Sequence, residues 1–279
     1  MTVNAKSLAV LPHVDAVLNY LAPTTEKPRR YAGHLEQDEQ QVVAKYERRR
    51  LRVHDARSVA DSLSLDDEGC QLVRHESAVR DFWNDEEVRR VYPEAEALIT
   101  AATGACWAFG FDHTVRRRIY GLPDRTPGAP RQPTLGVQAD YTEFSAPERV
   151  RDLMGQAADS LLRRRFAVIS AWRPIRGPLH DAPLAICDAN STAPGDLVAA
   201  DLIYRDRIGE TYAVKYSPAH RWLYIPGMWP GEVLLFKSYD SSRNGVARVV
   251  PYTSFEDPSA PADRLIQESI ELKALAFFA

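Results

Sequence analysis

Residues 201–228 read DLIYRDRIGETYAVKYSPAHRWLYIPGM, and this stretch gives the clearest indication of the fold. It holds three short runs of β-branched and aromatic residues, and charged, glycine and proline residues separate them. Runs of this length between turn-forming residues are typical of β-strands. The stretch therefore predicts short, closely spaced strands.

The same pattern continues on both sides of this stretch. Similar runs lie at 166–172, 182–187, 199–204, 210–216, 222–225, 232–237, 247–250 and 270–278. About eight short strands at this spacing are typical of a jelly-roll sandwich. We therefore expect an α+β fold class with a mainly β core.

Helical spacing is confined to a few other segments. Apolar residues recur every three or four positions in 85–102, and Ser145 is a suitable N-cap for a helix over 145–165. Residues 36–64 are polar and favour an exposed helix and a connecting loop. We expect a single domain over 1–279, with a mainly helical or irregular part at 1–105 and a jelly-roll core at 106–279.

Composition narrows the class of protein. The chain has 279 residues, 45% of them hydrophobic and 26% charged, as in ordinary globular proteins, and a formal net charge of −3. This charge predicts no nucleic-acid or membrane partner. Three widely spaced cysteines favour a reducing compartment, so we expect a cytoplasmic protein. The expected partner is a small molecule, and the sequence leaves a homodimer open.

Several longer passages resemble one family. They are FDHTVRRR (111–118), DYTEFSAPERVRDL (140–153), AWRPIRGP (171–178), APLAICDANS (182–191), LLFKSYDS (234–241), QESIELKALAFF (267–278) and the stretch quoted first. The chain resembles the fungal and bacterial hydroxylase/desaturase family of secondary metabolism, which includes aspergillic-acid hydroxylase-like and gibberellin-desaturase-like proteins. This resemblance implies a double-stranded β-helix (jelly roll, cupin-like), flanked by N-terminal helices, that encloses Fe(II) and 2-oxoglutarate.

This sequence departs from the family pattern at the positions expected to hold the Fe(II) ligands. The family supplies a His-x-Asp pair and a distal histidine, the usual two imidazoles and one carboxylate. Here the corresponding residues are Gln138, Asp140 and Tyr252. Gln267 and Lys273 replace two family arginines that are candidates for the cosubstrate carboxylate. A neutral amide and a protonated phenol are poor ligands for Fe(II), so no metal and no cofactor are expected.

Other histidines are weak candidates to replace the missing ligands. The string His13-Val14-Asp15 precedes the predicted core, and a bare tripeptide is weak evidence for a metal site. His113 and His220 lie in family-like stretches where the histidines are not ligands. His180 either faces the cavity as an acid–base group or lies on the surface.

Without iron, the remaining polar residues suggest other roles. Asp140 is the candidate proton-transfer group, with a pKa raised by burial, while Tyr252 and Gln138 would donate to a developing oxyanion. Lys273 would anchor a carboxylate or act as a general acid, although it could instead pair with Glu271. The candidate substrate-binding residues are Trp172, His180, Gln267 and His220.

Three functions remain open from the sequence. The leading hypothesis is a metal-independent natural-product tailoring enzyme, namely a cyclase, isomerase or lyase. The alternatives are a noncatalytic metabolite-binding pseudoenzyme and an unconventional Fe(II)/2-oxoglutarate-dependent hydroxylase or desaturase. The substrate would be a natural-product intermediate of unknown scaffold.

Overall fold

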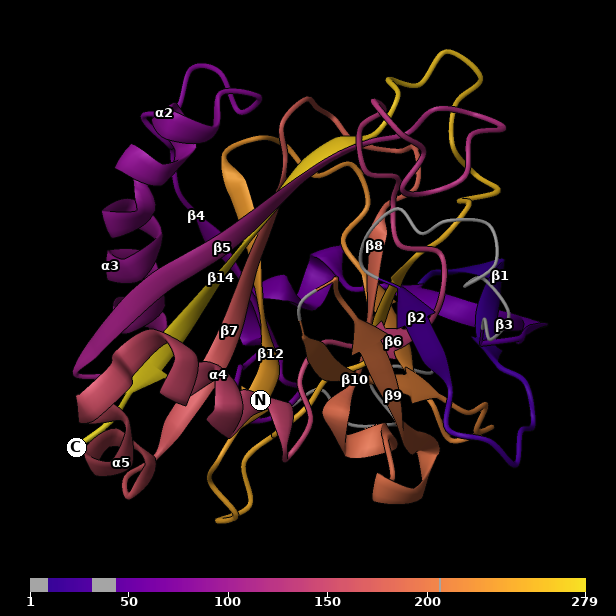
Figure 1. Ribbon diagram of the computed structural model, residues 1–279. Coiled ribbons are helices and arrows are strands. Elements are labelled where there is room, and N and C mark those ends of the chain that lie inside the picture. Colours follow the sequence, from indigo (N-terminus) through magenta and orange to yellow (C-terminus); the bar gives the residue numbers. More distant parts are fainter. Residues whose placement is uncertain (1–9, 32–43, 206) are drawn as a thin grey trace.

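The computed structural model describes residues 10–31, 44–205 and 207–279. Within them the strands form two sheets (Figure 1). The nine-stranded sheet has the order β1(His13–Leu21), β3(Tyr46–Asp55), β11(Trp222–Tyr224), β8(Leu184–Cys187), β13(Tyr252–Ser254), β6(Gln138–Ala139), β10(Ile208–Val214), β9(Leu197–Ile203) and β2(Arg29–Tyr31). The five-stranded sheet has the order β4(Cys70–Arg74), β12(Glu232–Asp240), β7(Phe166–Pro174), β14(Glu268–Phe277) and β5(Trp107–Arg117).

The main core lies between the two sheets. Trp172 and Phe236 of the five-stranded sheet pack in one buried cluster with Ile186, Leu223 and Tyr252 of the other sheet. Burial of apolar side chains from two facing sheets is the main stabilising contribution in a sandwich of this kind. The prediction of an α+β fold with a jelly-roll core is confirmed.

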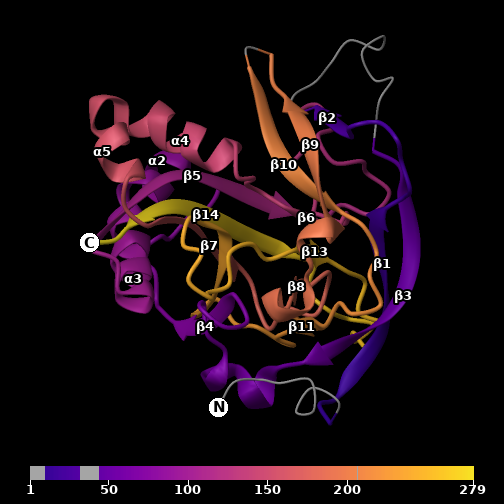
Figure 2. The same cartoon turned by 90° about the horizontal axis from the view of Figure 1, so that it is seen from below.

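Helices cover the outer face of the five-stranded sheet. α2(Asp85–Arg90) and α3(Tyr92–Thr103) lie against β5, β14 and β7, where Ile99 packs in a cluster with Ile169 and Leu272 (Figure 2). Side chains alternate between the faces of a strand, so the neighbours of these residues point toward the other sheet. This alternation places Ser170, Glu271 and Lys273 on the inner face.

The helix expected at 145–165 is interrupted. It consists of α4(Ser145–Met154), η3(Gly155–Ala157) and α5(Ala158–Leu162), and the break falls at Gly155, whose φ is +52°. Glycine adopts this backbone conformation without the steric penalty of a β-carbon. α4 and α5 pack over Val168 and Leu275 at one end of the five-stranded sheet. Three further short 3-10 segments are η2(Arg57–Ser62), η4(Ala189–Ser191) and η5(Pro194–Asp196).

The first part of the chain contains strands that the sequence pattern did not indicate. Strands β1 to β4 lie within 1–105, and β3 occupies part of the segment expected to be exposed helix and loop. β3 is highly charged because only one face packs inward, with Val53 buried and Leu51 partly buried against it. Residues 36–43 of that prediction lie outside the described residues. No helix in the described ranges is long and apolar enough to span a membrane.

Candidate functional site

Three of the four altered family positions, Gln138, Tyr252 and Lys273, come together with the retained Asp140. They lie on two paired strands of one sheet and on a strand of the other. β13 pairs with β6 so that Tyr252 lies opposite Gln138, and Asp140 follows two residues later on the same side. Lys273 reaches the same place from the inner face of β14. The structure therefore brings Gln138, Asp140, Tyr252 and Lys273 together.

Asp140 lies among hydrogen-bond donors. The Tyr252 hydroxyl donates to Asp140 Oδ1 over 2.7 Å, and Gln138 Nε2 lies 3.2 Å from the same oxygen. Lys273 Nζ is 3.1 Å from Asp140 Oδ2. Asp140 is thus held as an anion by a phenol, an amide and an ammonium group.

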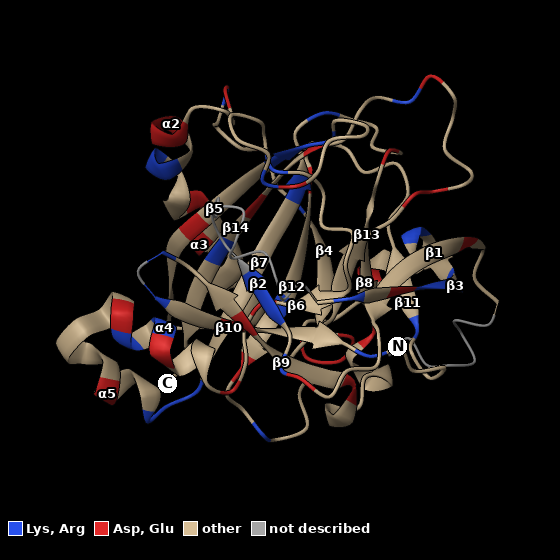
Figure 3. Ribbon diagram, turned by 45° about the vertical axis from the view of Figure 1, so that its right-hand side comes forward, with Lys and Arg blue, Asp and Glu red and all other residues tan. Residues whose placement is uncertain are grey.

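The orientation of the Gln138 amide follows from its other neighbour. The Arg30 guanidinium donates to Gln138 Oε1, and Gln138 Nε2 donates to the Tyr252 oxygen over 2.8 Å. Arginine has no acceptor, so the carbonyl oxygen must face Arg30 and the NH2 group must face the carboxylate. Figure 3 shows the basic residues of β2, the strand that carries Arg30, beside β9 and β10.

Lys273 bridges two carboxylates. Its ammonium group is 3.2 Å from Glu271 Oε1 as well as 3.1 Å from Asp140, and Ser170 Oγ donates to Glu271 over 2.9 Å. Burial disfavours the charged amine, but Asp140 and Glu271 together raise the pKa of Lys273 well above its usual value. Lys273 therefore stays protonated near neutral pH, and so high a pKa makes it a weak proton donor for the predicted role of general acid.

The expectation of a raised pKa for Asp140 is wrong. Burial alone would raise it, but the Lys273 ammonium and the Tyr252 hydrogen bond outweigh burial and lower the pKa of Asp140 below its usual value. Burial and the nearby Asp140 charge raise the pKa of Tyr252 well above its usual value. At neutral pH the cluster therefore contains a carboxylate, a protonated phenol and an ammonium ion.

These residues do not fit an ordinary Fe(II) centre. A metal cation requires electron-pair donors directed at one point, whereas Gln138, Tyr252 and Lys273 all direct protons at Asp140. Lys273 already supplies a positive charge beside the one carboxylate. In the described part of the chain no three His, Cys, Asp or Glu side chains gather where they could hold a metal ion.

A cavity of about 500 Å³ opens onto Asp140 and Lys273. α4 and the β9–β10 hairpin form its walls, which combine aromatic and aliphatic groups with charged ones. The apolar lining comes from Tyr141, Phe144, Leu202, Tyr204 and Ile208. Phe144 and Ile208 are 62% and 66% exposed, so they form an apolar part of the mouth beside the charged Glu148, Asp152 and Arg207. A volume of this size suits a small organic molecule.

None of the four predicted substrate-binding residues forms a hydrogen bond or ion pair with Gln138, Asp140, Tyr252 or Lys273 in the described structure. Trp172 is 3% exposed and packs with Tyr252 in the core between the sheets. Gln267 is buried and donates to Ser269, and its Oε1 has no hydrogen-bond partner among the described residues. His180 lines a different cavity, described below.

The remaining histidines have other surroundings. His220 lies between the Tyr20 hydroxyl at 3.0 Å and Asp196 Oδ2 at 3.2 Å, and its side chain is fully buried. This supports a hydrogen-bonded structural role. His113 similarly contacts the Tyr92 hydroxyl at 2.8 Å. His13 is on β1, close to His54, and is not near Asp140 in any contact that we find in the described structure.

Two residues of the cluster were not foreseen from the sequence. Arg30 orients Gln138, and the buried Arg116 on β5 helps to lower the pKa of Asp140. Arg116 belongs to the family-like passage at 111–118, which was the available signal. Arg30 lies far away in the sequence from the other members, and no local pattern marks it.

Comparisons with known proteins show which family the chain belongs to. A family model described as "Oxidoreductase/YMDC permease-like domain" matches residues 18–277. The chain is 30% identical to the hydroxylase/desaturase efuI of Hormonema carpetanum, with 96% of each chain covered. It is 31% identical to the alpha-ketoglutarate-dependent dioxygenase phiK of Fungal sp. (strain ATCC 74256), covering 95% of this chain and 96% of that protein.

A solved structure agrees with these relatives. The iron and alpha-ketoglutarate-dependent endoperoxidase NvfI superposes with a TM-score of 0.86 at 25% identity, covering 96% of this chain and 98% of that one. A protein named nvfI from Aspergillus novofumigatus is 30% identical over 82% of this chain and 83% of its own length. The fold assigned from the sequence is therefore that of a 2-oxoglutarate oxygenase.

The names of these relatives contradict the leading functional hypothesis. They are hydroxylases, desaturases, dioxygenases and an endoperoxidase, so the prediction of a metal-independent cyclase, isomerase or lyase is wrong. The prediction of an enzyme associated with secondary metabolism is supported. From the full-length matches and the shared fold, the chain belongs to the fungal hydroxylase/desaturase family with the 2-oxoglutarate oxygenase fold.

Proposed function

We propose that this protein is an oxidoreductase of the hydroxylase/desaturase type that acts on a small-molecule intermediate of secondary metabolism. The main support is the match to oxidoreductases over nearly the whole chain, together with the close structural likeness to an endoperoxidase. Of the alternatives left open by the sequence, an unconventional Fe(II)/2-oxoglutarate-dependent enzyme agrees best with these relatives.

The proposed substrate site is the cavity that reaches Asp140. Its rim offers apolar surface at Phe144 and Ile208, and its buried part offers the charged pair of Asp140 and Lys273. Such a cavity holds the body of an organic substrate by burial of apolar area and orients it through a few polar groups. The small-molecule partner and the possible homodimer remain proposals.

The ligand set makes this an unusual member of the family. A metal ion at Asp140 would compete with the Lys273 ammonium for the same carboxylate. The N–H and O–H groups that Gln138 and Tyr252 direct at Asp140 would also repel it. The residues themselves bind and orient: Lys273 and Tyr252 keep Asp140 ionised, and Arg30 fixes the Gln138 amide. We therefore propose the reaction class and the substrate cavity, and we derive no reaction step at a metal ion.

The test is oxidative turnover with the full-length protein. The protein would be incubated with Fe(II), 2-oxoglutarate, oxygen and an extract of natural-product intermediates, and succinate and oxidised products would be followed by mass spectrometry. We expect a product that has gained one oxygen atom or lost two hydrogen atoms, and we expect Asp140→Asn to abolish it. The relative efuI, assayed in parallel, shows that the conditions support turnover.

The opposite result is equally informative. If the protein forms neither succinate nor an oxidised product while efuI does, the assignment as an oxidoreductase fails. Binding of an intermediate without turnover would then favour a noncatalytic metabolite-binding protein, which the ion pair between Asp140 and Lys273 would explain.

A further inference from the structure

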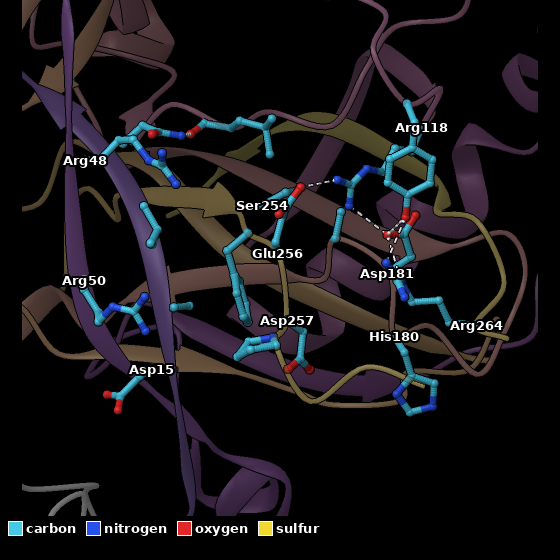
Figure 4. A pocket seen from close by; sticks show the side chains of 18 residues that line it. Asp15, Arg48, Arg50, Arg118, His180, Asp181, Ser254, Glu256, Asp257 and Arg264 are labelled. Carbon is cyan, nitrogen blue, oxygen red and sulfur yellow. Dashed lines mark hydrogen bonds and ion pairs between the residues drawn. The ribbon is translucent and has the colours of Figure 1, made fainter. Parts of the chain in front are cut away.

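A second cavity, of about 550 Å³, lies away from Asp140 (Figure 4). It shares no lining residue with the cavity at Asp140. One wall is the β1–β3 ladder, and the other is formed by segments around 118–120, 180–182 and 254–264. Its size suits a small organic ligand.

Two arginines dominate the β1–β3 wall. The antiparallel register places Asn19 opposite Arg48 and Val17 opposite Arg50, so all four share one face, while Leu18 packs into the core from the other face. Both arginines are exposed, and neither forms an ion pair with an acid in the described structure. In Figure 4 both extend from β3 into the cavity.

The acids on the opposite wall already have partners. Arg118 Nη1 donates to the buried Asp181 over 2.7 Å, and Arg118 Nη2 donates to Glu256 over 2.5 Å. Arg264 and the Tyr120 hydroxyl also contact Asp181. These acids and arginines pair with one another, whereas Arg48 and Arg50 on the β1–β3 wall have no ion-pair partner in the described structure.

The other two acids that line the cavity form no ion pair with Arg48 or Arg50 in the described structure. Asp257 accepts hydrogen bonds from the backbone N–H and the hydroxyl of Ser259 over 2.8 Å and 2.6 Å. Asp15 lies opposite Arg52 in the β1–β3 register, and Figure 4 shows its carboxylate turned away from the two guanidinium groups. An anion is therefore the ligand that complements this wall.

We propose that this cavity binds a small organic anion, a carboxylate or a phosphate with an apolar body. Arg48 and Arg50 bind the charged group, since the planar guanidinium fork matches carboxylate and phosphate oxygens. The apolar body lies against Val17, Leu135 and Pro258, of which Leu135 is 44% exposed. His180, which the sequence left open between a cavity and the surface, lines this cavity and not the one at Asp140.

Binding of simple probes to the full-length protein tests this proposal. Naphthoate and naphthyl phosphate are titrated by calorimetry at about 0.1 M salt, and neutral naphthamide serves as the uncharged probe. We expect at least one anion to bind and naphthamide to bind at least tenfold more weakly. The double variant Arg48→Gln/Arg50→Gln should weaken anion binding by about tenfold, and the preferred anion shows whether the site takes a carboxylate or a phosphate.

Two variants serve as controls. Arg52→Gln removes an exposed arginine from the same face of the same strand, but outside the cavity, and should change affinity less than twofold. Asp140→Asn should leave probe binding unchanged, whatever its effect on turnover. The proposal is overturned if neither anion binds at millimolar concentration, if naphthamide binds equally well, or if either control variant weakens binding as much as the double variant does.

Discussion

Replacing Lys273 by methionine tests the physical basis of the Asp140 cluster. The Lys273 side chain is 14% exposed, while Asp140 and Glu271 are 10% and 2% exposed, so methionine would leave two buried carboxylates without their shared cation. Removing one partner from a buried ion pair costs about 3–5 kcal/mol. Asp140 keeps its bonds from Tyr252 and Gln138, so Glu271 bears much of this cost.

Thermal unfolding at pH 7 measures the effect. An unfolding entropy of about 2.1 cal/mol/K per residue, over 279 residues, gives roughly 0.6 kcal/mol/K. A loss of about 3–5 kcal/mol therefore corresponds to a decrease in Tm of roughly 5–9 °C. Lys27→Met is the matched control because Lys27 also bridges two acids, Asp201 and Glu210, but is 46% exposed. An exposed pair of this kind contributes at most about 1 kcal/mol.

The pH dependence of the Lys273→Met effect has a definite sign. The folded-state pKa of Asp140 is lowered, so its contribution to stability is present above the unfolded pKa of about 3.9 and is lost as pH falls through the folded value. The raised pKa of Lys273 keeps the ammonium charged up to strongly alkaline pH. The wild-type and Lys273→Met proteins should therefore converge in stability in acid. The reasoning is refuted if Lys273→Met costs no more than Lys27→Met at pH 7.

Three further predictions concern separate parts of the molecule. Tyr252→Phe removes a hydrogen bond to an ionised carboxylate, so urea unfolding should show a loss of about 1.5–3 kcal/mol, and a loss below 0.5 kcal/mol would contradict the 2.7 Å contact with Asp140. Gly69→Ala should destabilise by roughly 1–3 kcal/mol, because Gly69 has a φ of +82° and a β-carbon would lie 2.7 Å from Val250; an unchanged Tm would contradict this. Burial lowers the pKa of His220, so the neutral imidazole contributes stability above a pH of about 6.5, and this contribution is lost in acid. His220→Gln should therefore flatten the pH–stability curve below a pH of about 6.5. Equal slopes for both proteins would argue against this reasoning.

The jelly-roll core was predictable because its strands are short and bounded by turn residues. Runs such as 210–216 and 232–237 carry β-branched and aromatic residues that few other structures accommodate. β3 was not recognised, because charged side chains fill one face of the strand and obscure the alternation. The helix at 145–165 was placed correctly, but its break at Gly155 depends on a local backbone conformation.

Gln138, Asp140, Tyr252 and Lys273 were also named from the sequence, since they occupy family positions within or beside matching passages. Their protonation states could not be predicted from the sequence. Burial suggests a raised pKa for Asp140, and only the placement of Lys273 and Tyr252 around the carboxylate reverses that direction. The reaction class was likewise misjudged from the altered ligands, and the relatives overturn it.

The sequence by itself determined the short strands and turns of the β-rich second half, the family, and which side chains replace the usual ligands. Only the tertiary structure decided what these side chains do to one another. Arg30, Asp140 and Lys273 lie on three separate strands or their ends, and their interaction falls steeply with distance and solvent exposure. Pairwise distances of this kind arise when the sheets pack, so no local pattern in the chain contains them. The same holds for Arg48 and Arg50, whose cavity exists because β1–β3 faces loops from distant parts of the sequence.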